Sequence, residues 1–278
     1  NIPPSISPFA YLTLTNGVAS LILVIVFFQR LRELDRKTLQ RSLVLAAIIC
    51  GNLLLERLGI SMIPASTASF VASLNIVFVP LLLLMFKRKP SANNVLGIVL
   101  ILTGLICTSG LKPGEPVNYG VLIMAAACLC MSVYIITVDR FTKASDPLLL
   151  GIGQIFFTAV LGFLMWFAEE PRTFFAVDYT NQILANVFLL AFFAKAYAYI
   201  MLMFSQKYAS PIAVTVIAST EPVVTMVLAL LIPNSFGQTE YLTSAKMIGA
   251  VFIVAGAICS GTGFLAKKNS IEQYVMEE

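Results

Sequence analysis

Two charged side chains occupy the middle of long apolar segments. Glu221 lies near the centre of one segment, and Lys195 lies near the centre of the segment before it. A charge at the centre of a bilayer costs roughly 2.5–3.5 kcal/mol on insertion scales, so neither side chain is expected to face lipid. One interpretation is a substrate or proton site, with Thr225 beside Glu221, one helical turn later. The alternative is structural: Lys195 and Glu221 pair with each other, or Glu221 hydrogen-bonds the helix that Pro222 opens.

Lys195 shares a helical face with three aromatic residues, because steps of three and four return to the same side of a helix. These residues are Phe188, Phe192 and Tyr199. Such a wall could stack a flat or aliphatic substrate while the ammonium group binds its carboxylate. Ordinary packing between helices is the other interpretation of the same stripe.

The composition requires membrane-spanning helices to position these side chains. Of the 278 residues 59% are hydrophobic and 12% are charged, and the mean hydropathy is +0.91. A water-soluble domain of this length is excluded, since such domains carry about a quarter charged residues. Apolar runs near the ~20 residues that cross a bilayer predict an all-α polytopic membrane protein. The predicted spans are 9–28, 42–60, 65–86, 93–111, 118–138, 147–167, 182–204, 209–232 and 244–265.

Basic residues are distributed unequally between the two sets of connectors. Connectors on one side carry thirteen lysines and arginines, against three on the other. The positive-inside rule therefore predicts an inner (plasma) membrane protein with a cytoplasmic C-terminus and an external first residue. An external start without a signal segment led us to expect one further helix upstream, with a native nine-span protein as the alternative.

The two halves of the chain share an internal repeat. Ala72-Ser73-Leu74-Asn75 matches Ala218-Ser219-Thr220-Glu221 at an offset of 146 residues, and Gly97, Gly104 and Cys107 match Gly249, Gly256 and Cys259 at an offset of 152. We expect five helices in each repeat; with the first helix missing, the first repeat has four and the second has five. An odd number of helices in each repeat inverts one half against the other, about an axis in the membrane plane. The predicted organisation is a first repeat over 1–111, a second over 118–266, whose 118–138 helix has no mate, and a tail over 267–278.

Three uncharged polar residues are further candidates for the site. Asn75 is the repeat mate of Glu221 and lies at the matching depth of the other half. Pseudo-symmetry would bring both toward one axis, although an Asn that bonds a neighbouring helix is an equal alternative. Tyr134 and Gln154 are weaker candidates of the same kind.

The chain resembles the drug/metabolite transporter superfamily, in its EamA-like branch, over essentially its whole length. The resemblance implies ten helices in two inverted five-helix repeats, and outward movement of amino acids, other small metabolites or drugs. Two departures are the absent first helix and Pro80, which lies four residues after the position equivalent to Pro222. The residues that carry the resemblance are Pro64-Ala65-Ser66-Thr67-Ala68, Val79-Pro80-Leu81-Leu82, Leu96-Gly97-Ile98, Thr103-Gly104, Ser210-Pro211-Ile212-Ala213, Ala218-Ser219-Thr220-Glu221-Pro222-Val223, Lys246-Met247-Ile248-Gly249-Ala250 and Ala255-Gly256.

These observations predict a secondary transporter of small organic metabolites that works by alternating access, with proton coupling through Glu221 as one option. The alternatives are a flippase of a lipid-linked group and a non-transporting membrane scaffold. An enzyme is not expected, because there is no His, no Gly-rich phosphate loop and no nucleophile with an evident base. No cofactor or metal is expected, and nucleic acid is not an expected partner. Glycine faces that permit close helix approach suggest packing, or a homodimer interface.

Overall fold

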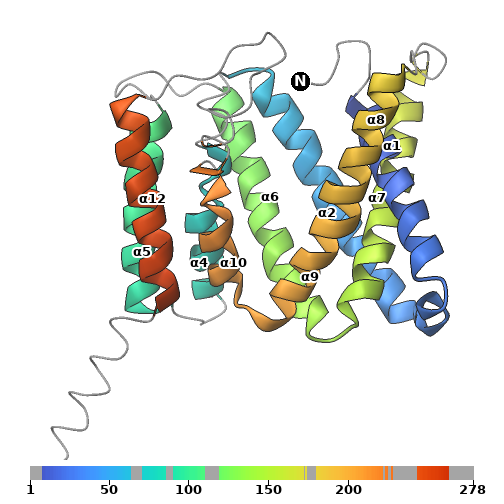
Figure 1. The fold of residues 1–278 in the computed structure, drawn as a ribbon, viewed down its shortest axis with the longest axis horizontal. Helices are drawn as coiled ribbons and strands as arrows, with labels where there is room; N and C mark the ends of the chain where they lie inside the picture. The colour runs from blue at the N-terminus through green and yellow to red at the C-terminus, as the bar shows by residue number, and fades with distance from the viewer. Residues whose placement is uncertain are drawn as a thin grey trace, which may run out of the picture. The chain divides into compact units, whose positions relative to one another are not determined.

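The computed structural model describes residues 8–63, 71–85, 90–109, 119–171, 173, 180–221, 223–224, 227 and 243–262. In these ranges all regular structure is helical (Figure 1). Helices satisfy every backbone polar group internally, as a bilayer requires. The elements are α1 (Pro8–Val26), the 3₁₀-helix η1 (Arg30–Glu33), α2 (Arg36–Ile60), α4 (Asn75–Met85), α5 (Ala92–Ser109), α6 (Tyr119–Thr142), α7 (Pro147–Glu169), α8 (Asn181–Leu189), the π-helix η3 (Leu190–Tyr197), α9 (Ala198–Tyr208), α10 (Pro211–Ala218) and α12 (Ser244–Thr262).

Within the described residues, helix occupies each of the nine predicted spans. Five helices are long and apolar enough to cross a membrane, and three more have shorter apolar described parts. Three predicted boundaries were wrong: α2 begins at Arg36 rather than at residue 42, α6 ends at Thr142 rather than at residue 138, and α9 ends at Tyr208 rather than at residue 204. All three extensions contain Lys, Arg or Gln, which are good helix formers, so the helix continues beyond its apolar stretch.

Capping residues and prolines determine where two helices begin. Asp146 caps α7 by accepting hydrogen bonds from the backbone N–H groups of Leu148 and Leu149, and Pro147 follows it directly. Ser210 caps α10 in the same way, with Pro211 next. Proline suits the first helical position because its fixed φ is helical and its missing N–H has no partner there.

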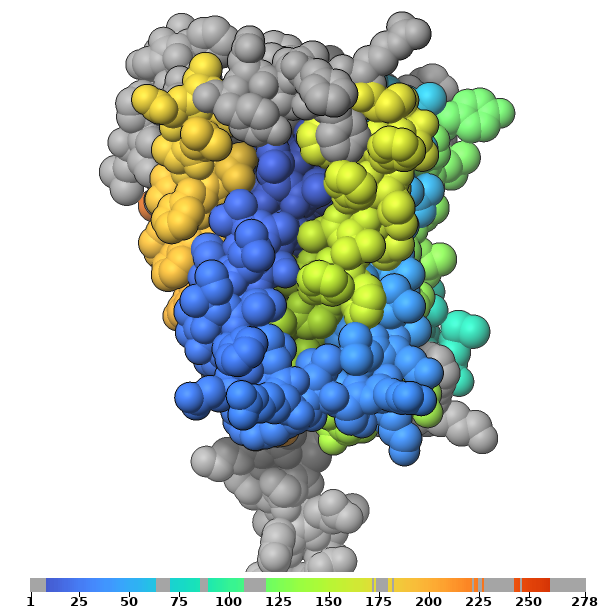
Figure 2. All heavy atoms as spheres, turned by 90° about the vertical axis from the view of Figure 1, so that its right-hand side faces the viewer, coloured from blue at the N-terminus to red at the C-terminus, as the bar shows by residue number. Residues whose placement is uncertain are grey.

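The chain forms two compact units that cut across the sequence repeats. Unit 1 comprises residues 1–53 and 134–209, and unit 2 comprises 54–133 and 210–278. In unit 1, α1 packs along α7, as Figure 2 shows, and also against η3. The shared core includes Ala19, Leu23 and Ile152. In unit 2, α4 packs on α10 and α5 packs along α12. Three pairs of helices that occupy equivalent places in the two repeats therefore contact each other within a unit: α1 with α7, α4 with α10, and α5 with α12.

Glycines bring α5 and α12 together backbone to backbone. A Cβ added at Gly97 would lie 2.6 Å from the carbonyl oxygen of Gly256, and one at Gly256 would lie 2.6 Å from that of Gly97. A Cβ at Gly104 would lie 2.5 Å from the carbonyl oxygen of Gly249. As the residue number rises along α5 it falls along α12, so the two helices are antiparallel.

The contact between α5 and α12 also has two-fold symmetry. A Cβ at Gly104 would lie 2.8 Å from Cγ1 of Ile253, and one at Gly256 would lie 2.8 Å from Cγ1 of Ile101. Gly104 and Gly256 are repeat mates, and so are Ile101 and Ile253, so each contact is matched by its mate. The inverted repeat predicted from the sequence is confirmed here. The suggestion that these glycines form a homodimer interface was wrong, because the same chain covers both glycine faces.

Candidate functional site

Two helical breaks occur at matching positions of the repeats. A turn at Ser73 and Leu74 precedes α4, and a turn at Ser219 and Thr220 follows α10. At each turn, two of three matching backbone N–H groups bond the carbonyl three residues back, which is the tighter 3₁₀ pattern, and the third bonds the carbonyl four residues back. In the first break, Leu74 N bonds Val71 O at 3.0 Å, Val77 N bonds Leu74 O at 2.9 Å and Phe78 N bonds Leu74 O at 3.0 Å. In the second break, the equivalent bonds are Thr220 N to Ile217 O at 3.0 Å, Val223 N to Thr220 O at 3.0 Å and Val224 N to Thr220 O at 3.2 Å.

Asn75 and Glu221 each follow one of these breaks directly. Asn75 is the first residue of α4 and is half-buried, whereas Glu221 resumes helix after the turn and its side chain is exposed. The start of a helix favours negative charge through the helix dipole. Thr225, the predicted neighbour of Glu221, lies outside the described residues.

The first break also frees a carbonyl group. Ile76 N bonds Ser73 O at 3.3 Å, so the Ala72 carbonyl is left to accept a hydrogen bond from the Cys128 thiol of α6 at 3.4 Å. Cys128 is buried. This contact ties the break to a neighbouring helix within unit 2.

Lys195 lies in the π-helical segment η3, between α8 and α9. Its Nζ lies 4.9 Å from the centre of the Tyr199 ring, a cation–π contact. A π-helical stretch widens the helix by one residue in a turn and is frequent at functional sites. Lys195 forms no ion pair with a carboxylate in the described part of the chain. Its ammonium is therefore held by an aromatic face rather than by a fixed counter-charge.

The predicted aromatic stripe exists, with much of it exposed. The Phe188 and Phe192 rings stack with centroids 6.4 Å apart and planes 16° from parallel, and Phe193 meets Phe192 edge-on at 5.0 Å. Phe188 and Phe192 are 56% and 43% exposed, so they offer open aromatic surface next to the segment that carries Lys195.

Tyr134 and Gln154 meet in the interior of unit 1. Gln154 Nε2 donates to the Tyr134 hydroxyl at 2.7 Å, and that hydroxyl lies 3.1 Å from Gln154 Oε1. Both side chains are almost fully buried. Two residues that the sequence predicted separately thus form one polar pair.

The predicted residues therefore form two groups, which are described separately. Lys195, Tyr199, Tyr134 and Gln154 belong to unit 1, as does Phe192 beside Lys195. Asn75 and Glu221 belong to unit 2, at the matching breaks. Their common role in one binding site remains a prediction.

Gln206 of α9 was missed by the sequence analysis. It is 1% exposed, yet neither Nε2 nor Oε1 has a hydrogen-bond partner among the residues that the structure describes. It lies seven residues after Tyr199 and so shares its helical face. That spacing was the available signal, but Gln206 precedes Lys207 near the helix end and resembles an ordinary interfacial residue.

Comparisons with known proteins give one family and one fold. The sequence profile of the EamA-like transporter family matches residues 2–110 and 118–262, that is, both repeats. A search of curated protein sequences finds no significant match. Among solved structures, one crystal structure, described only as that of a protein, has a similar fold, with a TM-score of 0.75 and 20% sequence identity. The match covers 95% of this chain and 90% of the chain in that structure. At this identity the similarity shows the fold alone.

Proposed function

The chain belongs to the EamA-like transporter family and is thus a membrane transporter of the drug/metabolite type, and we propose that it moves small organic metabolites outward by alternating access. Amino acids and related compounds are the proposed substrate class. The observation that carries the mechanism is the pair of matched helical breaks, because inverted repeats with discontinuous helices supply two related gates around one midplane site.

The proposed binding groups are those at and around the breaks and the π-helical segment. The half-helix starts at Asn75 and Glu221 suit recognition of charged or polar substrate groups, since a polar amide side chain and a carboxylate stand at these positions. Lys195 offers a cation for a substrate carboxylate, and Tyr199 and Phe192 offer aromatic surface for its apolar part. Thr225, Tyr134 and Gln154 complete the proposed set.

Glu221 is the proposed coupling residue. A carboxylate in a membrane-embedded site can alternate between a protonated form and an ionised form that binds a cation. Glu221→Gln keeps the shape and removes the charge. It is expected to abolish pH-dependent or cation-dependent flux, while the protein remains folded.

The proposed test is a flux screen in proteoliposomes with labelled amino acids, quaternary amines and nucleosides. The wild type, Glu221→Gln and Lys195→Gln are compared with two matched controls, Glu169→Gln at the end of α7 and Lys207→Gln at the end of α9. We expect the first two variants to lose most of the flux and the controls to keep it. Normal flux by Glu221→Gln across the pH range would remove Glu221 from the site. Flux no higher than in empty vesicles for every compound would refute the proposed substrate class.

The proposed location is an inner (plasma) membrane with the C-terminus in the cytoplasm. The support is the excess of basic residues in one set of connectors. A C-terminal fusion to a fluorescent protein that folds only in the cytoplasm should fluoresce, whereas a fusion to a periplasmic phosphatase should be inactive. The opposite pair of results would reverse the orientation.

A further inference from the structure

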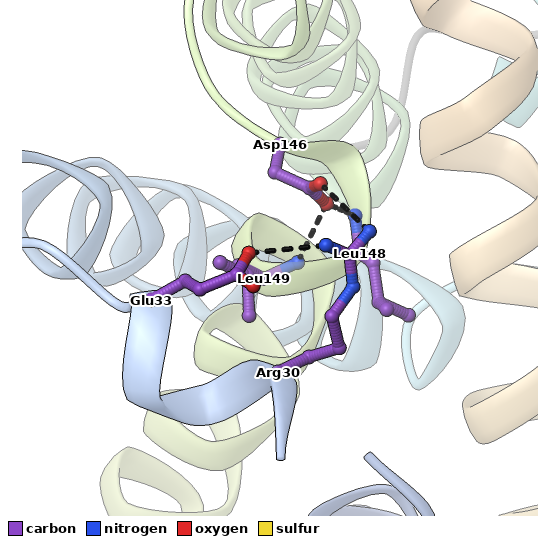
Figure 3. A network of polar contacts seen from close by, with 5 residues as sticks. All are labelled: Arg30, Glu33, Asp146, Leu148 and Leu149. Carbon is purple, nitrogen blue, oxygen red and sulfur yellow. Dashed lines mark hydrogen bonds and ion pairs between the residues drawn. The ribbon is translucent and has the colours of Figure 1, made fainter. Parts of the chain in front are cut away.

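Residues 30–41, here called the basic connector, join α1 to α2 and include the first residues of α2; two of their cations are occupied internally. Arg30 pairs with Glu33 at 3.0 Å and with Asp146 at 3.8 Å, and Figure 3 shows how Asp146 at the same time caps α7. Arg41 donates to the Ala144 carbonyl at 2.7 Å. These two arginines therefore hold the connector between α6 and α7, inside unit 1.

Three cations of the same connector have no such role. Arg32, Arg36 and Lys37 are exposed, and none pairs with a carboxylate in the described ranges. The nearby acids are engaged elsewhere: Glu33 by Arg30, and Asp35 by the backbone N–H of Thr38, whose side chain it also bonds. Hydrogen bonding to Thr38 lowers the pKa of Asp35 below its usual range. The connector thus presents three unpaired positive charges.

The three cations lie at the end of an exposed apolar surface of unit 1, of the kind that faces lipid. Leu43 and Val44 of α2 are 43% and 45% exposed, and they follow Arg36 and Lys37 by seven residues each. Seven residues return to the same helical face, two turns or about 10 Å along the axis. Lipid tails that contact Leu43 and Val44 would therefore place their headgroups beside Arg36 and Lys37.

Exposed apolar side chains near the end of α1 also precede these cations along the chain. Leu21 and Ile25 of α1 are exposed four residues apart and so share one face of the helix, and Phe28 is exposed in the turn that follows α1, before Arg32. In Figure 2 this connector is the blue lower edge of the face formed by α1 and α7. Apolar surface therefore borders the three cations along both helices.

We propose that Arg32, Arg36 and Lys37 form a binding site for the headgroup of an anionic phospholipid. Arginine side chains bind phosphate oxygens through paired N–H groups, and lysine adds a compact charge. The site lies away from the residues proposed to bind substrate, and it does not depend on that proposal.

The test measures which lipids the purified protein retains. The protein in neutral detergent is incubated with equal amounts of phosphatidylglycerol and phosphatidylcholine, and bound lipids are counted by native mass spectrometry. Each cation near an anionic surface contributes about fivefold, from ~1 kcal/mol. Arg36→Gln combined with Lys37→Gln should therefore reduce the preference for phosphatidylglycerol at least about tenfold.

Two further variants keep the result interpretable. Exchanging the two cations, Arg36→Lys with Lys37→Arg, preserves the charge and should keep the preference. Lys207→Gln removes a cation at the end of α9, where Ile200, seven residues earlier, is buried, so it should leave the preference unchanged. Absence of a preference in the wild type would overturn the proposal, as would an equal loss in Lys207→Gln. Displacement of the lipid by millimolar inorganic phosphate would assign the site to free anions and also overturn it.

Discussion

The substitution Gly104→Ala tests the backbone contact between α5 and α12. The added Cβ would lie 2.5 Å from the Gly249 carbonyl oxygen, whereas ordinary contact begins at 3.4 Å. The helices would have to separate locally by about 0.9 Å, and the obstacle is backbone that no side-chain rotation can move. Overpacking of this kind costs about 1–3 kcal/mol. The intrinsic advantage of Ala over Gly in a helix, up to about 1 kcal/mol, opposes it.

Gly17→Ala is the matched control for this substitution. A Cβ at Gly17 of α1 would meet nothing within 4 Å, so only the helix propensity changes and the stability should rise slightly. Thermal unfolding in detergent, followed by tryptophan fluorescence or by loss of the monodisperse peak, should separate the two variants by at least about 3 °C, with Gly104→Ala lower. Because the interface is symmetric, Gly256→Ala should behave like Gly104→Ala.

The result that refutes this reasoning is equal stability. If Gly104→Ala and Gly17→Ala unfold at the same temperature, the two helices do not approach as closely as described. If Gly104→Ala is destabilised and Gly256→Ala is not, the contact exists but lacks the two-fold symmetry.

Three further predictions concern polar groups. Gln206→Met replaces two buried polar atoms that have no hydrogen-bond partner among the described residues. It should stabilise the protein by about 1 kcal/mol or more and so raise the midpoint temperature of thermal unfolding. A lower midpoint would show that Gln206 has partners. Tyr134→Phe leaves Gln154 unpaired and should cost about 1–3 kcal/mol, whereas adding Gln154→Leu should recover most of the loss; two additive losses in thermal unfolding would contradict the pair. Because its pKa is lowered in the folded protein, the ionised Asp35 side chain stabilises the start of α2 at pH values above the ordinary pKa of 3.8. This stabilisation is lost as the pH falls through the lowered pKa. The protection of the first amides of α2 against hydrogen exchange, relative to their intrinsic exchange rates, should therefore fall in that acidic range in the wild type, while Asp35→Ala, which removes the acceptor of the Thr38 N–H, should lack this protection already at neutral pH; identical profiles would exclude this contribution.

The internal repeat made much of the fold predictable from the sequence. The matches around Asn75 and Glu221 predicted equivalent positions for these two residues but no break, which the structure shows directly before each of them. The glycines of α5 and α12 predicted close helix approach, since small residues permit it. They did not identify the partner helix, because a lone stripe of small residues is the same whether the neighbour is in the chain or in a second copy.

Other parts of the candidate site could not be read from the sequence. The π-helical segment around Lys195 has no characteristic composition, because it changes which backbone carbonyl each N–H bonds and not which side chains are present. The Tyr134–Gln154 hydrogen bond joins two helices, and helical spacing describes only residues of one helix. Gln206 was hidden by its position near a helix end, where polar residues normally reach water.

The α5–α12 contact has the form of an isologous subunit interface, in which residue i of one copy meets residue j of the other and j meets i. The same surface would assemble from two separate copies of one repeat inserted in opposite directions. In such a dimer every substitution would enter the interface twice and its energetic effect would double. Joining the repeats in one chain removes that constraint, because each of the two equivalent contacts can change while its mate stays the same. The single chain can therefore acquire different sequences on its two sides while the crossing of the helices is retained.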